Sequence, residues 1–317
     1  RRPLILAGYG LAALSKPLFA LAGSPGLVLG ARFADRIGKG LRGAPRDALI
    51  ADVTPADVRG RAFGLRQALD TVGAFLGPLL AIGLMALFAD NIRAVFWFAA
   101  LPAFASVLVL RFWVREPPRP ANGEGQPQVR ASDLRRLGSG FWLVAGIGVV
   151  FTLARFSEAF LILRAHELAL PVALAPGVLI VMNIVYAAGA LPAGILSDHI
   201  AARPLLLMGI ACLIAGDVLL AVATTLPLAF IGIGIWGLHL ALTQGLFAKL
   251  VADSAPAGLR GSAFGAFHLA TGLAMLAELA ERLPPQARRI EGEPPGLAAL
   301  CAAYRMNADL IRAQGTV

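Results

Sequence analysis

LAPGVLIVMNIVYAAGALPAGIL, residues 174–196, contains no charged side chain. The uncharged run extends over residues 168–197, and a second one covers residues 218–248. Each is longer than the ~20 apolar residues that cross a bilayer as a helix. Of the 317 residues 58% are hydrophobic and only 15% are charged, which leaves too little polar surface for a soluble globule. The sequence therefore predicts a polytopic membrane protein.

Apolar runs bounded by proline, glycine or charge predict nine membrane spans. We expect helices, because a helix satisfies its own backbone hydrogen bonds in hydrocarbon and the runs are too long for barrel strands. The predicted fold class is thus an all-α membrane helical bundle. The spans cover residues 3–22, 26–52, 61–88, 94–112, 139–163, 174–196, 204–223, 227–252 and 261–279.

The composition divides the chain into two bundles. Residues 117–130, PPRPANGEGQPQVR, have the composition of a solvated linker that forms no core. We predict four domain segments: an incomplete N-terminal half with four spans, a cytoplasmic linker, a C-terminal half with five spans and a polar tail. They cover residues 1–114, 115–138, 139–279 and 280–317.

The positive charges are distributed unevenly between the two sides of the predicted bundle. With Arg1 on the cytoplasmic side, the opposite loops carry only Arg93 and Arg164. Such a bias predicts an inner-membrane protein with a cytoplasmic linker, and it accounts for the net charge of +9 without nucleic acid. The cytoplasmic side carries Arg1, Arg2, Arg59, Arg61, Arg111, Arg115, Arg119, Arg130, Arg135, Arg136, Arg203 and Arg260.

An internal repeat relates the two halves. At a shift of 201 positions, residues 48–65 (ALIADVTPADVRGRAFGL) and 249–266 (KLVADSAPAGLRGSAFGA) share ten of eighteen residues. The same shift places Arg2-Pro3-Leu4 on Arg203-Pro204-Leu205. Parallel repeats of this kind occur in a large class of transporters. We therefore expect two homologous halves, the first without its first two helices and the second without its last.

The loop at residues 194–203, GILSDHIAAR, resembles the G-x-L-x-D-(R/K)-x-G-(R/K)-(R/K) loop of the major facilitator superfamily. The resemblance implies twelve helices in two halves around a cavity, of which this chain would hold the third to the eleventh. It also implies that Asp198 lies at the positive end of a neighbouring helix and, with nearby arginines, latches the cavity. An ordinary turn would explain the same residues. The predicted gating residues are Asp52, Arg59, Asp198, Arg203, Asp253 and Arg260.

A second resemblance lies in the span 61–88. Gly64, Gly73, Gly77 and Pro78 follow the spacing of the fifth-helix motif of proton-coupled exporters in the superfamily, which favours antiport and export. Two closing glycines of that motif are replaced here by Ala81-Ile82, and close helix packing would also explain the spacing.

A charged stripe runs along the span 26–52. Charges at bilayer depth are costly when they face lipid, so we expect these side chains to face the cavity or one another. Arg36-Ile37-Gly38-Lys39-Gly40 resembles the R-x-x-Q-G motif of the superfamily, which implies a role for Arg36 in proton coupling. Arg46 is expected to extend to the headgroup region. The stripe comprises Arg32, Asp35, Arg36, Lys39, Arg42, Arg46 and Asp47.

Further candidates for the substrate and proton pathway lie on other spans. Helical spacing permits ion pairs between Arg66 and Asp70 and between Arg155 and Glu158. His239 and His268 can titrate near neutral pH, although a histidine in a helix often serves packing. The remaining pathway candidate is Gln244.

No pattern indicates an enzyme, a cofactor or a metal. Gly232 to Gly237 match G-x-G-x-x-G but lie within an apolar helix and follow no strand. We expect a monomer in the lipid bilayer that acts as a secondary transporter of a small solute, with protons as the coupling ion. The excess of cations in the stripe favours an anionic solute, although the same charges can serve coupling alone. The alternative is a truncated or non-transporting membrane scaffold of the same fold.

Overall fold

The computed structural model describes residues 1–89, 91–114, 134, 136–171 and 174–282. Within them the chain is all-helical, which confirms the predicted fold class. Most of the predicted linker and tail lies outside the described residues.

Four long helices form the N-terminal half. Side-chain caps help to define two of their starts: Ser24 accepts a hydrogen bond from the backbone N–H of Leu27, and Asn91 accepts one from Ala94. The elements are α1 (Arg2–Leu21), α2 (Pro25–Val53), the 3₁₀ turn η1 (Ala56–Val58), α3 (Arg59–Leu87) and α4 (Ile92–Phe112).

The C-terminal half repeats this pattern after an interrupted first span. Proline stands in the first turn of α7 and α9, where its missing N–H has no helical partner. The elements are α5 (Ser139–Ala154), α6 (Ala159–Glu167), α7 (Ala175–His199), α8 (Ala202–Val222), α9 (Leu226–Ser254), the 3₁₀ turn η4 (Ala257–Leu259) and α10 (Arg260–Arg282).

The predicted continuous helix over residues 139–163 is wrong. Arg155 adopts an extended conformation with φ −97° and ψ 117°, and α6 begins four residues later. The Ser157 hydroxyl accepts from the Ala159 backbone N–H, a local bond that competes with the helical one. Two helices therefore replace the single predicted one.

Seven segments of the described chain are long and apolar enough to cross a membrane, with α5 and α6 counted together. The predicted spans that fall outside this set are α2 and α10. The charged stripe excludes α2, and α10 is too polar over its length. Both helices pack against helices of the other half.

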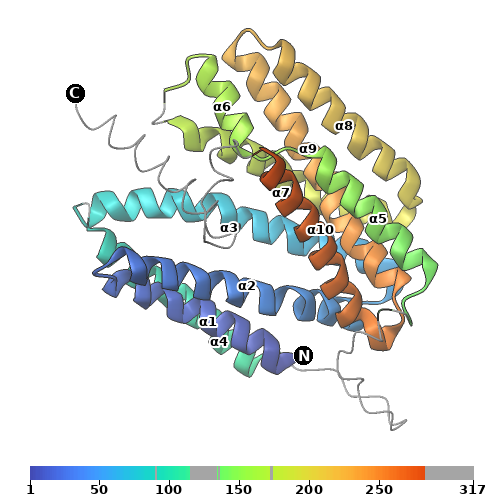
Figure 1. The fold of residues 1–317 in the computed structure, drawn as a ribbon, viewed down its shortest axis with the longest axis horizontal. Helices are drawn as coiled ribbons and strands as arrows, with labels where there is room; N and C mark the ends of the chain where they lie inside the picture. Colours follow the sequence, from blue (N-terminus) through green and yellow to red (C-terminus); the bar gives the residue numbers. More distant parts are fainter. Residues whose placement is uncertain (90, 115–133, 135, 172–173, 283–317) are drawn as a thin grey trace.

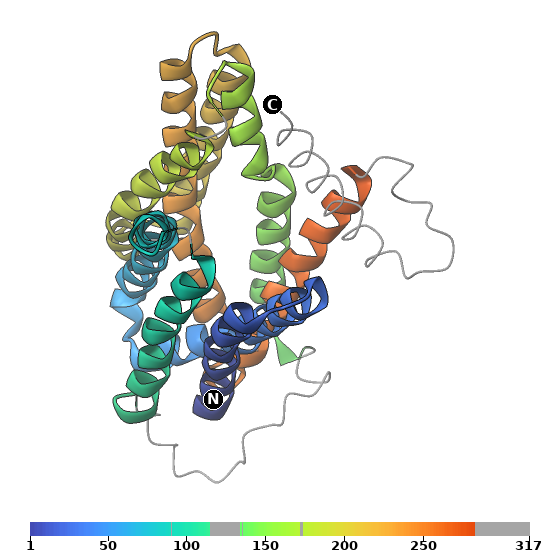
Figure 2. The same ribbon diagram turned by 90° about the vertical axis from the view of Figure 1, so that its left-hand side faces the viewer.

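The helices form two groups that meet along α3 (Figures 1 and 2). In the first group α1 packs between α2 and α4, and in the second α9 packs between α7 and α8. Although α3 belongs to the N-terminal half in sequence, its main partner is α7. The two halves are therefore joined through α3.

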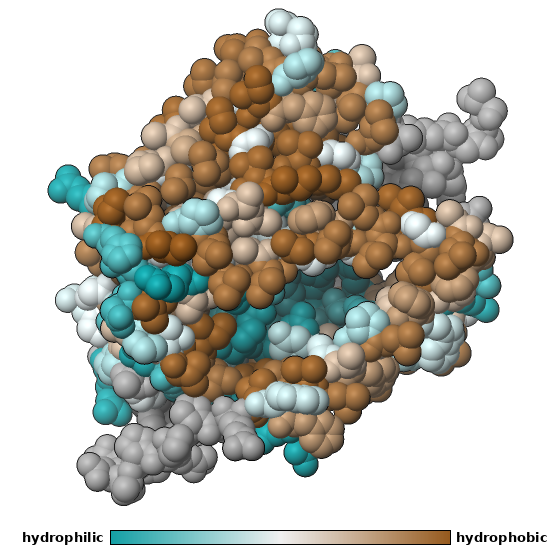
Figure 3. All heavy atoms as spheres, turned by 180° about the vertical axis from the view of Figure 1, so that it is seen from behind, coloured by the Kyte–Doolittle hydropathy of each residue, from teal (hydrophilic) through white to brown (hydrophobic). Residues whose placement is uncertain are grey.

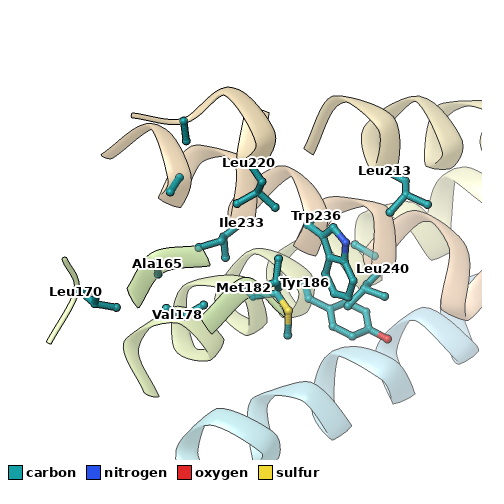
Figure 4. Close-up of a cluster of buried hydrophobic side chains, with 14 of the residues drawn as sticks. Ala165, Leu170, Val178, Met182, Tyr186, Leu213, Leu220, Ile233, Trp236 and Leu240 are labelled. Atoms are coloured by element: carbon teal, nitrogen blue, oxygen red, sulfur yellow. The ribbon is translucent and has the colours of Figure 1, made fainter. Parts of the chain in front are cut away.

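Two apolar clusters stabilise this arrangement. One lies within the C-terminal half, where Trp236 and Ile233 of α9 pack against Met182 and Val178 of α7 (Figure 4). The other joins the halves: Phe63 of α3 lies in the same cluster as Phe264 of α10, and their ring centroids are 6.0 Å apart. The second cluster marks the end of the bundle where the halves are closest.

Candidate functional site

Two ion pairs join the halves beside the second cluster. Arg59, at the start of α3, contacts Asp253 of α9 at 2.7 Å. Arg260, at the start of α10, contacts Asp52 of α2 at 2.8 Å. The internal repeat aligns Arg59 with Arg260 and Asp52 with Asp253. The arginine of each half thus binds the aspartate of the other, and we call these four residues the latch.

Asp198 forms a third connection at the same end. Its carboxylate accepts hydrogen bonds from the backbone N–H groups of Gly60 and Arg61, at 2.7 and 3.0 Å. Unpaired N–H groups at a helix start attract an anion, which explains why the buried carboxylate is stabilised there. Lys249 adds an ion pair at 3.2 Å.

Arg203 does not take part in this connection. It is exposed at the start of α8 and forms no ion pair with a described residue. The cations that contact Asp198 are Lys249 and Arg61. The loop motif therefore indicated the carboxylate, whereas its partners come from α3 and α9.

Gly64 lets α3 approach α7 closely. A Cβ atom at this position would lie 2.9 Å from the Cα atom of Gly194. By contrast, a Cβ atom at Gly73 or Gly77 would meet no described atom within 4 Å. Close packing therefore applies to Gly64 but not to the other two glycines, and Pro78 lies within the continuous α3 helix.

A polar network joins three helices next to the latch. Asp47 on α2 is buried, and its Oδ1 atom lies 3.3 Å from Arg46 and 3.5 Å from Arg66 of α3. Asp70 binds the same two arginines, at 3.4 Å from Arg46 and 2.9 Å from Arg66. His268 of α10 lies 3.4 Å from Asp47 Oδ2. We call these five residues the Asp47 network.

One ion pair of the Asp47 network was predicted from the sequence, whereas the prediction for Arg46 was wrong. The structure forms the expected pair between Arg66 and Asp70. The expectation that Arg46 extends to the headgroups is wrong, because this side chain binds Asp47 and Asp70.

The remaining charges of the stripe divide into paired and unpaired groups. Asp35 binds Lys16 of α1 at 2.9 Å, and the Arg42 guanidinium lies 4.3 Å from the ring centre of Tyr9. The other three side chains are exposed and form no ion pair with a described residue. These are Arg32, Arg36 and Lys39.

The unpaired cations lie on the same side of α2 as the Asp47 network. At 100° per residue, positions 32, 36, 39, 46 and 47 fall within an arc of about 100°. On the face of the molecule shown in Figure 3, hydrophilic residues line a hollow between hydrophobic ridges. The helix therefore presents a mostly cationic face, and the molecule has a polar hollow.

The other pathway candidates form no ion pair with the described residues of the Asp47 network. Arg155 and Glu158 form no ion pair with each other, because the break between α5 and α6 removes the helical spacing on which the prediction depended. His239 is buried, hydrogen-bonded to the Gly209 carbonyl at 2.8 Å and stacked on Phe151. Those contacts are typical of a packing residue.

Gln244 is half-buried on α9, and it has no hydrogen-bond partner among the described residues. In the part of the chain that the structure describes, no three His, Cys, Asp or Glu side chains are grouped to hold a metal ion.

Sequence reasoning missed the central position of Asp47 and His268. Asp47 was expected only as one of seven charges in the stripe, and no motif includes His268. The repeat offers one signal: the shift of 201 aligns Asp47, Arg66 and Asp70 with the uncharged Ala248, Phe267 and Thr271. The Asp47 network is therefore absent from the repeated pattern, unlike the latch.

Comparison with known proteins gives consistent results. The family model described as Major Facilitator Superfamily matches residues 1–277. An uncharacterized MFS-type transporter of Methanocaldococcus jannaschii is 32% identical over 292 residues, which are 87% of this chain and 70% of the relative. The chain spans 66% of the length of the uncharacterized mycobacterial relatives that it matches.

Solved structures share the fold at lower identity. The transporter FucP in its outward conformation aligns with a TM-score of 0.69 at 16% identity, over 95% of this chain and 80% of FucP. The proton:xylose symporter XylE aligns with a TM-score of 0.66 at 18% identity, over 88% of this chain and 71% of XylE.

Proposed function

Because this chain belongs to the Major Facilitator Superfamily, we propose that it is a secondary active transporter that moves a small solute against a flow of protons. Proteins of this family are multi-pass membrane transporters and not enzymes. The glycine-proline spacing of α3 favours export as the direction.

The latch is the observation that carries this proposal. Two reciprocal ion pairs and Asp198 connect the halves at one end, while α2 presents exposed cations further along the helix. The latch consists of ion pairs that are partly exposed, so water can replace each partner when the halves separate, as a contact that opens in each cycle requires. Alternating access by rocking of two repeats is the transport mode that such an arrangement supports.

The latch end is the cytoplasmic end in this proposal. Arg59, Arg61, Arg203 and Arg260 all lie there, as the positive-inside rule requires of cytoplasmic loops. The structure would then be closed to the cytoplasm. The two halves, residues 1–114 and 139–279, would move as bodies joined by a linker over residues 115–138.

The unpaired cations favour a solute that carries a negative charge. Arg32, Arg36 and Lys39 have no ion-pair partner among the described residues, and the Asp47 network balances its own two arginines with two aspartates. An anionic group bound beside them would offset the cost of the unpaired cations. A scaffold that does not transport would have no use for these exposed, unpaired charges.

A flux assay tests the proposal. Purified protein is placed in liposomes that contain a pH-sensitive dye, and carboxylates, phosphate esters, sugars and organic cations are added in turn. We expect an anionic class to move protons across the membrane, with no proton movement in protein-free liposomes. If none of the four classes moves protons or accumulates under a pH gradient, the scaffold alternative is favoured.

A further inference from the structure

The contact between His268 and Asp47 joins the halves through an imidazole and a carboxylate. His268 Nε2 lies 3.4 Å from Asp47 Oδ2, whereas the two arginines contact Oδ1. One oxygen of the Asp47 carboxylate therefore contacts the two arginines, and the other contacts the imidazole.

The two partners differ in access to solvent. The His268 side chain is 48% exposed, while that of Asp47 is 3% exposed. Phe264 and Phe267 lie beside the imidazole, with ring centroids 6.2 and 6.0 Å away. A proton can thus reach the imidazole from solvent, whereas the carboxylate is shielded.

The charges of the Asp47 network sum to zero while His268 is neutral. Two arginines and two aspartates cancel, so a proton on His268 gives the network a net charge of +1. The helix α5, which also packs on α10, contains no ionisable side chain, and Lys249 and Asp253 of α9 are bound to Asp198 and Arg59. The ionisable groups that face the contact are Tyr9 of α1, Arg46 and Asp47 of α2, Arg66 and Asp70 of α3, and His268 of α10.

We infer that His268 and Asp47 form a proton-binding site that links the two halves next to the latch. This inference rests on the proposed function for its role in coupling. In the neutral state Nε2–H donates to Asp47, and Nδ1 accepts the incoming proton from water. The resulting imidazolium forms an ion pair with Asp47 and draws α10 toward α2, so protonation favours the latch-closed state.

The site differs from the position that the family motif indicated. Arg36 is permanently charged and therefore cannot bind and release a proton itself. The imidazole of His268 can do so, because it has a neutral and a cationic form. Arg36 would interact with the solute directly or through its electrostatic field, and the pair of His268 and Asp47 would bind the proton.

Distance measurements between spin labels test this inference without a solute. The labels are placed on Asp57→Cys in η1 and Gly258→Cys in η4, exposed positions that the repeat relates to each other, with Cys212 and Cys301 replaced by serine. The protein is studied in nanodiscs from pH 5 to pH 8. We expect the population with the longer distance to increase about fivefold as the pH rises.

Two variants of His268 should shift the populations in opposite directions. His268→Gln, which stays neutral, should show the pH 8 distribution throughout, and His268→Arg, which stays positive, should show the pH 5 distribution. Asp47→Asn should also remove the pH response. The matched control is His166→Gln on α6, which should respond like the unmodified protein.

The results separate this inference from the proposed function. A pH response that persists in His268→Gln, or an unmodified protein without a response, would overturn the proton site. A response that depends on His268 would support the site even if the flux assay detected no transport. Proton-driven flux that is unchanged in His268→Gln would overturn the site and leave the proposed function standing.

Discussion

Arg36 and Arg46 lie ten positions apart on α2 but have different surroundings. Arg46 binds two carboxylates, whereas Arg36 is exposed and unpaired among the described residues. A transport role and a structural role can therefore be separated within one helix.

We expect Arg36→Ala to abolish proton-driven flux while the free energy of unfolding changes by less than about 0.5 kcal/mol, because no folded-state contact is lost. Arg46→Ala should lower that free energy by about 1–3 kcal/mol, because it removes one partner from the buried Asp47. Thermal unfolding in detergent and dye-based flux at matched expression measure both effects. Near-normal flux in Arg36→Ala would show that Arg36 has no role in proton-driven transport.

At the scale of the helices, α3 and α7 contact each other closely through two glycines, which have no side chain. Gly64 and Gly194 face each other, and an added Cβ atom at Gly64 would also lie 2.5 Å from the Ala190 carbonyl oxygen. Small residues allow such an approach between helices in a membrane.

Gly64→Ala should therefore destabilise the protein by about 1–3 kcal/mol through overpacking. Gly73→Ala, on the same helix, meets open space and should be neutral or slightly stabilising, because alanine favours a helix by up to about 1 kcal/mol. Melting temperatures of the two purified variants test this contrast. Equal losses in both would indicate that helix propensity, not packing, governs α3.

At the scale of the whole molecule, the reciprocal pairs of the latch set the balance between closed and open states. Arg59→Asp places two carboxylates opposite each other, and Asp253→Arg places two arginines there. Each single change should increase the longer distance between labels at positions 57 and 258. The double exchange should restore the original distribution, because the charges are again complementary.

Arg203→Asp is the matched control for this experiment, since Arg203 lies near the same end but forms no ion pair with a described residue. It should leave the distance distribution unchanged. A double exchange that fails to restore the closed state would show that the contact between Arg59 and Asp253 does not hold the halves together.

The orientation of the molecule is tested by cysteine accessibility in intact cells. A membrane-impermeant reagent should label cysteines at residues 91 and 168 from outside and should not label cysteines within residues 115–133, because the positive-inside rule places that linker in the cytoplasm. Permeabilised cells supply the control for the linker positions. Labelling of the linker from outside would reverse the orientation.

Much of the architecture was predictable because it depends on local patterns. Hydropathy located the seven segments of the described chain that are long and apolar enough to cross a membrane, and the repeat identified the latch residues before any contact was known. The loop motif likewise indicated that Asp198 would lie at a helix start, where the structure places it. These features follow from the composition and residue spacing within each span, because each helix satisfies its own backbone hydrogen bonds in the bilayer.

The tertiary structure decided which charges meet. Asp47 and His268 belong to different halves, and their contact depends on the rotation and depth of α2 and α10, which no periodicity encodes. The break at Arg155 likewise removed an ion pair that helical spacing had allowed. Hydropathy determines that a helix crosses the membrane. The face it turns toward its neighbours depends on close contacts such as that of Gly64 with Gly194, which form only when the helices pack.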